Sequence, residues 1–353
     1  MIGEFRIGDR ALGGDHPVYV VAELSANHLQ DFHIAEEIVK RAKLAGANAI
    51  KTQTYSPDSL TINFATGGEK ACQGTIWQGT PLYELYSRAC TPMEWQEKIR
   101  DLAVGLGMDF FSTAFSEKDV EFLEKLDVPV HKIASFEIVD IPLIEYMAST
   151  GKPLIISTGM ATIDEIHEAV DTAVSFGAPQ VLLLKCTSAY PAKPEEMHLA
   201  TIPDMRKRFG VPVGLSDHSM DLEVPMTAVA MGACLVEKHL TLDRGLGGPD
   251  SKFSLEPDEF DRMVKSIRLV ERCKGNITYG PTEEEKNSLP CRRSLYAVKD
   301  IMAGEKLSLD NVRSIRPAYG LHPREMRSVL GRKAARNIKA GEPLEWSMLS
   351  DES

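Results

Sequence analysis

The sequence predicts a TIM (β/α)8 barrel at residues 18–273, followed by a small β-rich domain at residues 291–353. In the first segment, eight short runs of mostly Val, Ile, Leu and Ala alternate with amphipathic stretches, as expected for parallel strands buried on both faces. Eight strands alternating with helices over about 250 residues is the pattern that closes such a barrel. The runs are Val18–Ala22, Ala49–Thr52, Phe110–Ala114, Val130–Ala134, Leu154–Ser157, Val181–Cys186, Val211–Leu215 and Cys234–Glu237.

Helix signals separate these runs. After the first run, Ile34, Ile38 and Ala42 fall on one helical face. The segments Ser116–Asp119 and Thr162–Glu165 resemble capping boxes, at which helices begin. An open doubly wound sheet is the alternative, and it is disfavoured because no GxGxxG motif follows the first run.

Three further segments complete the predicted domain organisation. Residues 1–17 are expected to form a small hairpin ahead of the first strand. Residues 274–290 are polar with an acidic run and are typical of a linker. Beyond them, residues 298–305 are echoed by residues 335–342, which indicates a small domain built from two similar units.

One connection inside the barrel is unusually long, from Tyr55 to Thr91. Long connections in a compact domain are usually functional or disordered. Because this one carries Trp77, Tyr83 and Tyr86, we expect an ordered lid over the pocket. The alternative is that these side chains pack against the barrel wall.

Composition excludes several classes of function. The net charge of −11 argues against nonspecific binding to nucleic acid or to an anionic membrane. The first residues do not form a signal peptide, and no stretch approaches 18 uninterrupted apolar residues. The six cysteines form no CxxC pair, so we expect reduced thiols in a cytoplasmic protein.

Polar residues follow the apolar runs at the point where each predicted strand ends. In a TIM barrel these positions form the active site. Lysines and hydroxyls dominate them, as expected for an oxyanion or phosphate site built from side chains. No GxxxxGK[ST] loop is present to bind phosphate through backbone amides. The residues are Glu23, Asn27, His28, Lys51, Gln53, Ser112, Thr113, Lys132, Ser135, Ser157, Thr158, Lys185, Thr187, Ser188, Tyr190, Ser216, Asp217, His218, Glu237, Lys238 and His239.

Two chemistries follow from this set. His218 and His239 end neighbouring strands about 4.8 Å apart, so both imidazoles could bind one divalent cation, better suited to Mn, Zn, Co or Fe than to Ca. The alternative is that these histidines are core residues whose ring nitrogens form hydrogen bonds within the protein. The strand-end lysines also permit a Schiff-base aldolase, unless they are solvated or ion-paired.

The motifs resemble those of the sialic acid synthase family, in order along essentially the whole chain, and the tail resembles the family's antifreeze-like, or SAF, domain. They are AELSANH (22–28), KTQTY (51–55), STAF (112–115), KIAS (132–135), ISTGMAT (156–162), KCTSAYP (185–191), GLSDH (214–218), EKH (237–239) and GGPD (247–250).

The resemblance implies condensation of phosphoenolpyruvate with an open-chain amino-sugar aldehyde. It implies that His218 and His239 bind a metal, with Mn²⁺ expected and Co²⁺ or Mg²⁺ as alternatives, and that no organic cofactor is needed. Glu23 is the expected base, and Lys51 and Lys132 are catalytic as well. The phosphoenolpyruvate set is Lys51, Thr113, Lys132, Ser135, Ser157, Ser188 and Ser216. The sugar set is Asn27, Gln53, Tyr190, Asp250 and Arg316. Arg316 is expected from the SAF domain of a partner subunit, in a domain-swapped homodimer.

Within the family, the segments IWQGTPLYELY, GGPDSKFSLEP, RRSLY and VRSIRPAYGLHP look most like the branch that makes pseudaminic acid. That branch implies the acceptor 2,4-diacetamido-2,4,6-trideoxy-L-altrose and release of phosphate with a nine-carbon 2-keto acid. N-acetylneuraminic or legionaminic acid synthesis is the alternative with the same chemistry. A Schiff-base aldolase and a noncatalytic sugar-binding protein are the remaining ones. Cys291 stands where the family pattern has Phe, which puts the packing near the linker in doubt.

Overall fold

The computed structural model describes residues 4–63 and 73–350, and the chain divides after Gly275 into two units. Each unit is described by itself. The first three residues of the predicted hairpin, residues 64–72 of the predicted lid and the last three residues of the tail lie outside the described residues. No helix in the described part is long and apolar enough to cross a membrane.

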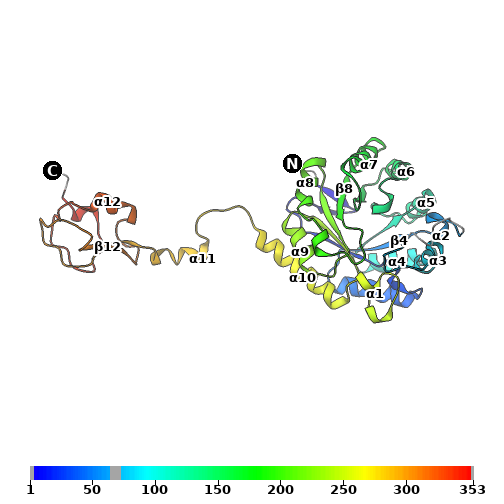
Figure 1. Ribbon diagram of the computed structural model, residues 1–353, viewed down its shortest axis with the longest axis horizontal. Coiled ribbons are helices and arrows are strands. Elements are labelled where there is room, and N and C mark those ends of the chain that lie inside the picture. Colours follow the sequence, from blue (N-terminus) through cyan, green and yellow to red (C-terminus); the bar gives the residue numbers. More distant parts are fainter. Residues whose placement is uncertain (1–3, 64–72, 351–353) are drawn as a thin grey trace. The chain divides into compact units, whose positions relative to one another are not determined.

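Eight parallel strands in the first unit close into a barrel, in which the last strand pairs with the first (Figure 1). This closure confirms the predicted TIM barrel and excludes the open sheet. Nearly every residue of the eight strands is buried, because one face meets the barrel interior and the other meets the helices. The strands are β3 (Tyr19–Glu23), β4 (Ala49–Thr54), β5 (Asp109–Ala114), β6 (His131–Ile133), β7 (Leu154–Ser157), β8 (Val181–Cys186), β9 (Val213–Asp217) and β10 (Leu235–His239).

Helices form a ring outside the strands (Figure 1). Their starts follow local sequence: the Ser116 side chain accepts from Asp119 N, and Thr162 and Glu165 form a reciprocal capping box. The main helices are α1 (Phe32–Leu44), α4 (Met93–Gly105), α5 (Glu117–Lys125), α6 (Ile141–Ser149), α7 (Ile163–Ser175), α8 (Thr201–Phe209), α9 (Glu223–Ala230) and α10 (Pro257–Lys274). Shorter helices in the loops are η1 (Ser25–His28), α2 (Pro57–Leu60), α3 (Leu82–Ala89), η2 (Ser135–Glu137), η3 (Pro194–Glu196), η4 (Arg244–Leu246) and η5 (Ser251–Phe253).

The N-terminal hairpin, β1 (Phe5–Ile7) and β2 (Arg10–Leu12), turns at Gly8, whose φ of 55° suits glycine. Its apolar residues are buried in the same core as the barrel. Arg10 donates to the carbonyl of Gly107, at the start of β5, so the hairpin covers the N-terminal end of the barrel. The hairpin does not cover the opposite, C-terminal end of the barrel, where the polar residues at the strand ends lie.

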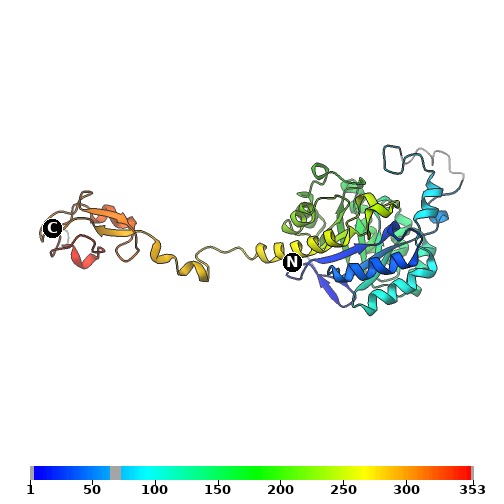
Figure 2. The same ribbon diagram turned by 90° about the horizontal axis from the view of Figure 1, so that it is seen from below.

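The second unit contains one antiparallel pair, β11 (Ser294–Ala297) and β12 (Val312–Ile315), drawn in orange in Figure 2. The rest is turns and isolated bridges around a separate apolar core. Short helices complete the described part of this unit. Two of them precede β11, namely α11 (Glu283–Lys286) and η6 (Leu289–Cys291). The others follow β12 and are η7 (Pro323–Glu325), α12 (Met326–Val329) and η8 (Trp346–Met348). The predicted linker therefore contains helical turns. Cys291 is exposed, so a thiol there leaves no gap in the core.

The repeated sequence of this unit builds a reciprocal pair of turns. Ile301 and Ile338, which occupy equivalent positions in the two copies, each donate to the other's carbonyl at 2.9 Å. Asp300 accepts from the amide of Ala340, and its equivalent Asn337 accepts from the amide of Ala303. The two copies therefore bind each other through the same contacts, which the sequence echo alone did not predict.

A glycine in the barrel wall provides a test of how tightly the strands pack. A Cβ at Gly214 would lie 2.6 Å from the carbonyl oxygen of Leu235 and 2.7 Å from the Leu184 side chain. Because backbone cannot move aside easily, we expect Gly214→Ala to lower the free energy of unfolding by about 1–3 kcal/mol. Chemical denaturation followed by circular dichroism measures the change.

The matched control is Gly105→Ala at the end of α4, where a Cβ meets nothing within 4 Å. This change should leave the unfolding free energy unchanged or raise it by up to about 1 kcal/mol, since alanine favours helix. Equal stability of the two variants would contradict the close packing at Gly214.

Candidate active site

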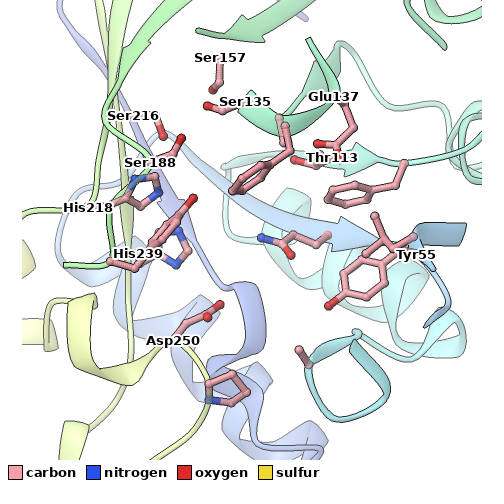
Figure 3. Close-up of a pocket in the computed structure, with 18 of the residues that line it drawn as sticks. Tyr55, Thr113, Ser135, Glu137, Ser157, Ser188, Ser216, His218, His239 and Asp250 are labelled. Carbon is pink, nitrogen blue, oxygen red and sulfur yellow. The ribbon is translucent and has the colours of Figure 1, made fainter. Parts of the chain in front are cut away.

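A cavity of about 510 Å³ opens at the carboxyl ends of the barrel strands (Figure 3). Strands β4 to β10 and the loops that follow them supply its polar lining. The structure brings most of the predicted site residues together here. They are Lys51, Gln53, Thr113, Lys132, Ser135, Ser157, Ser188, Tyr190, Ser216, His218, His239 and Asp250.

Three of the residues assigned to catalysis or to substrate do not line this cavity. Glu23 lies fully buried behind it and reaches it through Lys51. The amide of Asn27 donates to the carbonyl of Leu240 at 3.0 Å and to Ser254 Oγ at 2.9 Å. Asn27 was expected to contact sugar, but its amide group instead holds the loop after β10. Arg316 belongs to the second unit, directly after β12. Seven further strand-end positions do not line the cavity either: His28, Ser112, Thr158, Lys185, Thr187, Asp217 and Lys238.

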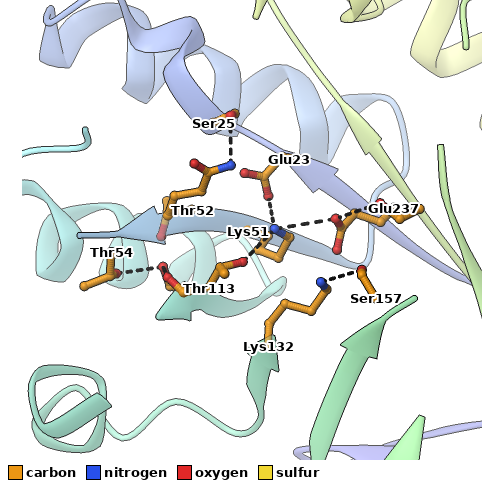
Figure 4. Close-up of polar contacts among 12 residues, drawn as sticks. Glu23, Ser25, Lys51, Thr52, Thr54, Thr113, Lys132, Ser157 and Glu237 are labelled. Carbon is orange, nitrogen blue, oxygen red and sulfur yellow. Dashed lines mark hydrogen bonds and ion pairs between the residues drawn. The ribbon is translucent and has the colours of Figure 1, made fainter. Parts of the chain in front are cut away.

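A buried ion-pair network lies at the base of the cavity (Figure 4). Lys51 Nζ is 2.7 Å from Glu23 Oε2, 3.5 Å from Glu237 Oε1 and 3.1 Å from Thr113 Oγ1. Adjacent strands make this possible, because Lys51 is the register partner of Glu23. Burial alone would lower the pKa of Lys51, but the two carboxylates outweigh it and hold that pKa above its usual value. This shift favours the cationic form of Lys51.

The pKa values of the two carboxyl groups in this network shift in opposite directions, although burial raises both. Burial raises the pKa of Glu23, and the attraction of Lys51 offsets only part of the rise. In Glu237 the nearby lysines outweigh burial, so its pKa lies below the usual value. The same ammonium group thus faces one carboxylate that stays charged and one that protonates readily.

Lys132 has no such counterion. Its Nζ donates to Ser157 Oγ at 2.7 Å and to the carbonyl of Ile133 at 2.8 Å, and within residues 4–63 and 73–350 no carboxylate forms an ion pair with it. Burial lowers the pKa of Lys132 to about 8. A buried ammonium without a partner is stabilised by an anionic ligand, so this position is suited to bind one.

Hydroxyl groups converge beside Lys132 because a glycine lets the backbone approach. Ser135 Oγ accepts from the amide of Gly159 at 3.1 Å. A Cβ at Gly159 would collide with the hydroxyls of Ser135 and Ser188. The glycine of the ISTGMAT motif is therefore required by close contact, and it gathers donors around the anion position.

His218 and His239 lie together at one side of the cavity, with ring centres 5.3 Å apart (Figure 3). Two imidazoles that each bind one cation at about 2.1 Å, with a roughly tetrahedral angle, have ring centres roughly 5 Å apart. His218 Nδ1 lies 3.2 Å from the carbonyl of Thr187, and a proton donated there leaves Nε2 as a ligand. His239 Nδ1 is buried and has no hydrogen-bond partner among the described residues. Burial lowers the pKa of His239, which favours the neutral ring that a metal ligand needs, whereas the neighbouring Cys186 outweighs burial and raises the pKa of His218.

The pair therefore fits a divalent cation. No group of three or more His, Cys, Asp or Glu side chains within the described ranges could hold a metal, so the remaining positions would belong to water or substrate. Open positions of this kind are characteristic of catalytic rather than structural metal sites.

Aromatic and apolar side chains form the rest of the wall. Trp77, Tyr190 and Phe253 pack against one another and around the two histidines, with ring centres 4.5–6.2 Å apart. Trp77 Nε1 donates to the carbonyl of Pro249 at 2.8 Å, which ties the long connection to the loop that carries Asp250. The described part of this connection borders the cavity with Thr75, Trp77, Leu82, Leu85, Tyr86 and Ala89, whereas Tyr83 does not line it.

Glu137 is a lining residue that the sequence reasoning missed. It follows β6 in η2, and its Oε2 is buried without a hydrogen-bond partner among the described residues. Burial raises its pKa to about 7. Its position two residues after Ser135, just beyond a strand end, is the signal that could have identified it. Cys186 was also missed, although it ends β8 and its Sγ lies 3.8 Å from His218 Nδ1.

Two family models match the sequence. Residues 38–279 match the NeuB family, and residues 292–350 match the SAF domain. The chain belongs to the NeuB family. This finding confirms the resemblance to sialic acid synthases and their SAF domain.

Curated members of the NeuB family extend the comparison. A protein named pseudaminic acid synthase from Campylobacter jejuni is 43% identical over 333 residues, or 94% of this chain and 97% of the relative. A protein named N,N'-diacetyllegionaminic acid synthase from Legionella pneumophila is 35% identical over 347 residues, or 96% of each. The crystal structure of a sialic acid synthetase from Leptospira borgpetersenii, in complex with citrate, has a TM-score of 0.72 and 30% identity over 81% of this chain and 95% of its own.

The lowered pKa of Lys132 predicts that anion binding depends on pH. Lys132 is cationic below about pH 8 and neutral above it. Sulfate keeps a constant charge in this range, so its affinity should fall about tenfold between pH 7 and pH 9 as Lys132 loses its proton. Calorimetric titration of the protein with sulfate measures this fall.

Two variants assign the effect to one side chain. Lys132→Met should bind sulfate weakly and lose the part of the pH dependence that comes from Lys132, while ionisation of Glu137 can still weaken binding as the pH rises. Lys185→Met should behave like the unchanged protein, because Lys185 also ends a strand but does not line the cavity. An undiminished pH dependence in Lys132→Met would contradict the role given to this residue.

Proposed function

We propose that this chain catalyses the condensation of phosphoenolpyruvate with 2,4-diacetamido-2,4,6-trideoxy-L-altrose and water, which gives pseudaminic acid and phosphate. The observation that carries the proposal is a single cavity in which an unpaired buried ammonium and converging hydroxyls face two histidines suited to a cation. Relatives named pseudaminic acid synthases are 42–44% identical to the chain, against 35% for the relative from Legionella named for legionaminic acid.

The apolar part of the cavity supports this acceptor. Leu60 in α2 and Leu82, Leu85 and Ala89 in α3 line it beside Phe115. The proposed acceptor carries two acetamido methyl groups and a methyl group at C6. Burying such groups against apolar side chains is favourable, whereas a hydroxyl there would lose its hydrogen bonds to water. The wall therefore favours a deoxy, diacetamido sugar over a fully hydroxylated one.

The lysines and hydroxyls provide the first part of the mechanism. Lys51 and Lys132 bind the phosphate and carboxylate charges of phosphoenolpyruvate, and Thr113, Ser135 and Ser216 with their neighbours donate hydrogen bonds. These contacts are made by strand-end groups whose positions are fixed before the substrate arrives. They orient the enol carbon toward the aldehyde near the histidines.

Carbon–carbon bond formation leaves positive charge at the enol-ether carbon, and water then adds there. We assign the base for this water to Glu23, whose pKa is raised by burial and which lies behind Lys51, so the water must approach it past the Lys51 ammonium group. The tetrahedral intermediate collapses by breaking the carbon–oxygen bond to phosphate. His218 and His239 would hold a divalent cation, Mn²⁺ in preference to Co²⁺ or Mg²⁺, which would polarise the aldehyde carbonyl.

The assembly that we propose is a domain-swapped homodimer, in which Arg316 of one subunit completes the sugar site of the other. The separate core of the second unit supports this arrangement, because such a unit can fold as a body of its own. Cys90, Cys186, Cys234, Cys273 and Cys291 are free thiols, which supports the cytoplasm as the location; Cys72 lies outside the described residues.

The first test of the function is a phosphate-release assay with phosphoenolpyruvate and matched acceptors. We expect turnover with the proposed sugar, and kcat/KM lower by about 10–100-fold when the C6 methyl group carries a hydroxyl. Leu85→Ala should narrow this difference, since it removes part of the apolar wall. Leu44→Ala, at a position 75% exposed on α1, is the control and should change neither number.

Other outcomes would point elsewhere. Faster turnover with the hydroxylated sugar would contradict the proposed acceptor. A lysine adduct trapped by borohydride, without phosphate release, would favour the Schiff-base aldolase. Binding of sugar without any release of phosphate would favour the noncatalytic alternative.

A second test concerns the assembly. His218→Ala and Arg316→Ala chains should each be inactive alone. In a swapped dimer formed from one chain of each kind, one site holds both defects and the other holds neither. Activity should therefore return to about a quarter of the normal value after random subunit exchange. Native mass spectrometry must confirm the mixed dimers; if they form and stay inactive, the second unit serves its own barrel.

A further inference from the structure

A buried ion pair lies directly behind the two histidines. Lys238 Nζ is 2.7 Å from Asp217 Oδ2, and the two side chains are 1% and 0% exposed. Asp217 immediately precedes His218, and Lys238 immediately precedes His239. Successive side chains of a strand point to opposite faces. The histidines line the cavity and neither member of the pair does, so the pair occupies the layer between strands and helices.

Stability alone does not explain charges in this layer. Taking an ammonium and a carboxylate out of water costs more than their attraction commonly returns, and well-packed apolar residues in their place are often neutral or stabilising. The surrounding positions of β9 and β10 are apolar and fully buried, such as Leu215 and Val236. A charged pair there requires a reason beyond holding the barrel together.

The pair makes contacts that apolar residues could not make. Asp217 Oδ1 accepts from the amide of Ser219 at 2.9 Å and from its hydroxyl at 2.7 Å. Lys238 Nζ also donates to the carbonyl of Ser219. Ser219 is fully buried. The three residues, called here the brace, therefore tie the backbone on both sides of His218 to the residue before His239.

The brace fixes a part of the chain that the barrel itself leaves free. Strand β9 ends at Asp217, so His218 and Ser219 lie beyond it, and the register of β9 with β10 ends where Lys238 pairs with Asp217. His239 is still held, since it is the register partner of Glu23. Besides the brace, His218 is held from the loop after β8, through the carbonyl of Thr187 at its Nδ1 and the amide of Ala192 at its carbonyl.

We propose that the Asp217–Ser219–Lys238 brace positions His218 relative to His239 for binding of a divalent cation. This inference rests on the metal site of the proposed function and names three positioning residues for it. Groups behind metal ligands commonly change metal affinity by 10–100-fold when removed. A rigid brace reduces the ordering that the cation must otherwise impose on the loop.

The test is cation affinity, measured on the full chain after removal of metal by a chelator. Co²⁺ is the probe, because imidazole ligands change its visible absorption. Asp217→Asn and Lys238→Met should each weaken Co²⁺ binding by about 10–100-fold. Asp109→Asn is the matched control, since Asp109 also forms an ion pair, with Arg10, but at the opposite end of the barrel. It should bind Co²⁺ like the unchanged protein.

Two further sets of variants separate the possible failures. His218→Ala and His239→Ala should abolish binding; if they bind Co²⁺ normally, the metal site of the proposed function is wrong and the inference fails with it. If they lose binding while folded brace variants bind normally, only the inference is wrong.

Circular dichroism establishes whether each variant is folded. The double variant of Asp217→Asn with Lys238→Met leaves no uncompensated charge, and Ser219→Ala removes a single hydroxyl contact. If Asp217→Asn or Lys238→Met alone does not fold, the double variant and Ser219→Ala still test the brace. Normal Co²⁺ affinity in either of these folded variants would overturn the role of the brace.

Discussion

Burial of several charged groups at one end of a closed barrel is the constraint on which the site depends. Barrel closure places inward side chains of β3, β4, β6 and β10 where little of their surface meets bulk water, with Glu23, Lys51, Lys132 and Glu237 each at most 5% exposed. Each charge there must find a partner or shift its pKa. Lys51 finds two carboxylates and remains a cation, whereas Lys132 finds none and its pKa falls to about 8. The ammonium group of Lys132 is therefore available to an anionic ligand, and the hydroxyl groups around it can donate hydrogen bonds to that ligand.

The sequence predicted the barrel and most of the site because both depend on local patterns. A run of consecutive apolar residues marks a strand buried on both faces, and the residue after it lies at the open end of the barrel wherever the chain goes next. Lys51, Lys132 and His239 could be placed by this rule alone. The sequence repeat that carries Asp300 and Asn337 likewise indicated that the second unit contains two similar parts.

What could not be predicted depends on the paths of the loops. Asn27 follows Ser25, whose φ of 46° turns the chain so that the Ser25 hydroxyl reaches Asp250 and the Asn27 amide reaches the loop after β10. No periodicity in the sequence signals such a turn, because a serine adopts positive φ only where its surroundings require it. Sequence reasoning missed Glu137 for a related reason. Glu137 faces the cavity from a short helix beyond the strand, where side chains no longer alternate between two faces.

The groups that bind anion and cation lie on different elements of the fold from the side chains that select the acceptor sugar. Most of the anion-binding and cation-binding groups lie on strands, where hydrogen bonds to neighbouring strands fix their positions. Ser135 and Ser188 lie just beyond strand ends, as does His218, which the brace holds one residue past the end of β9. The apolar side chains that face the acceptor stand on α2 and α3, in a connection whose packing does not hold the barrel closed. A change at Leu85 can therefore alter the shape of the acceptor wall while Lys132 and His239 keep their places. In this arrangement the carbon–carbon bond-forming chemistry can stay constant while the acceptor sugar varies, because each is carried by a different layer of the fold.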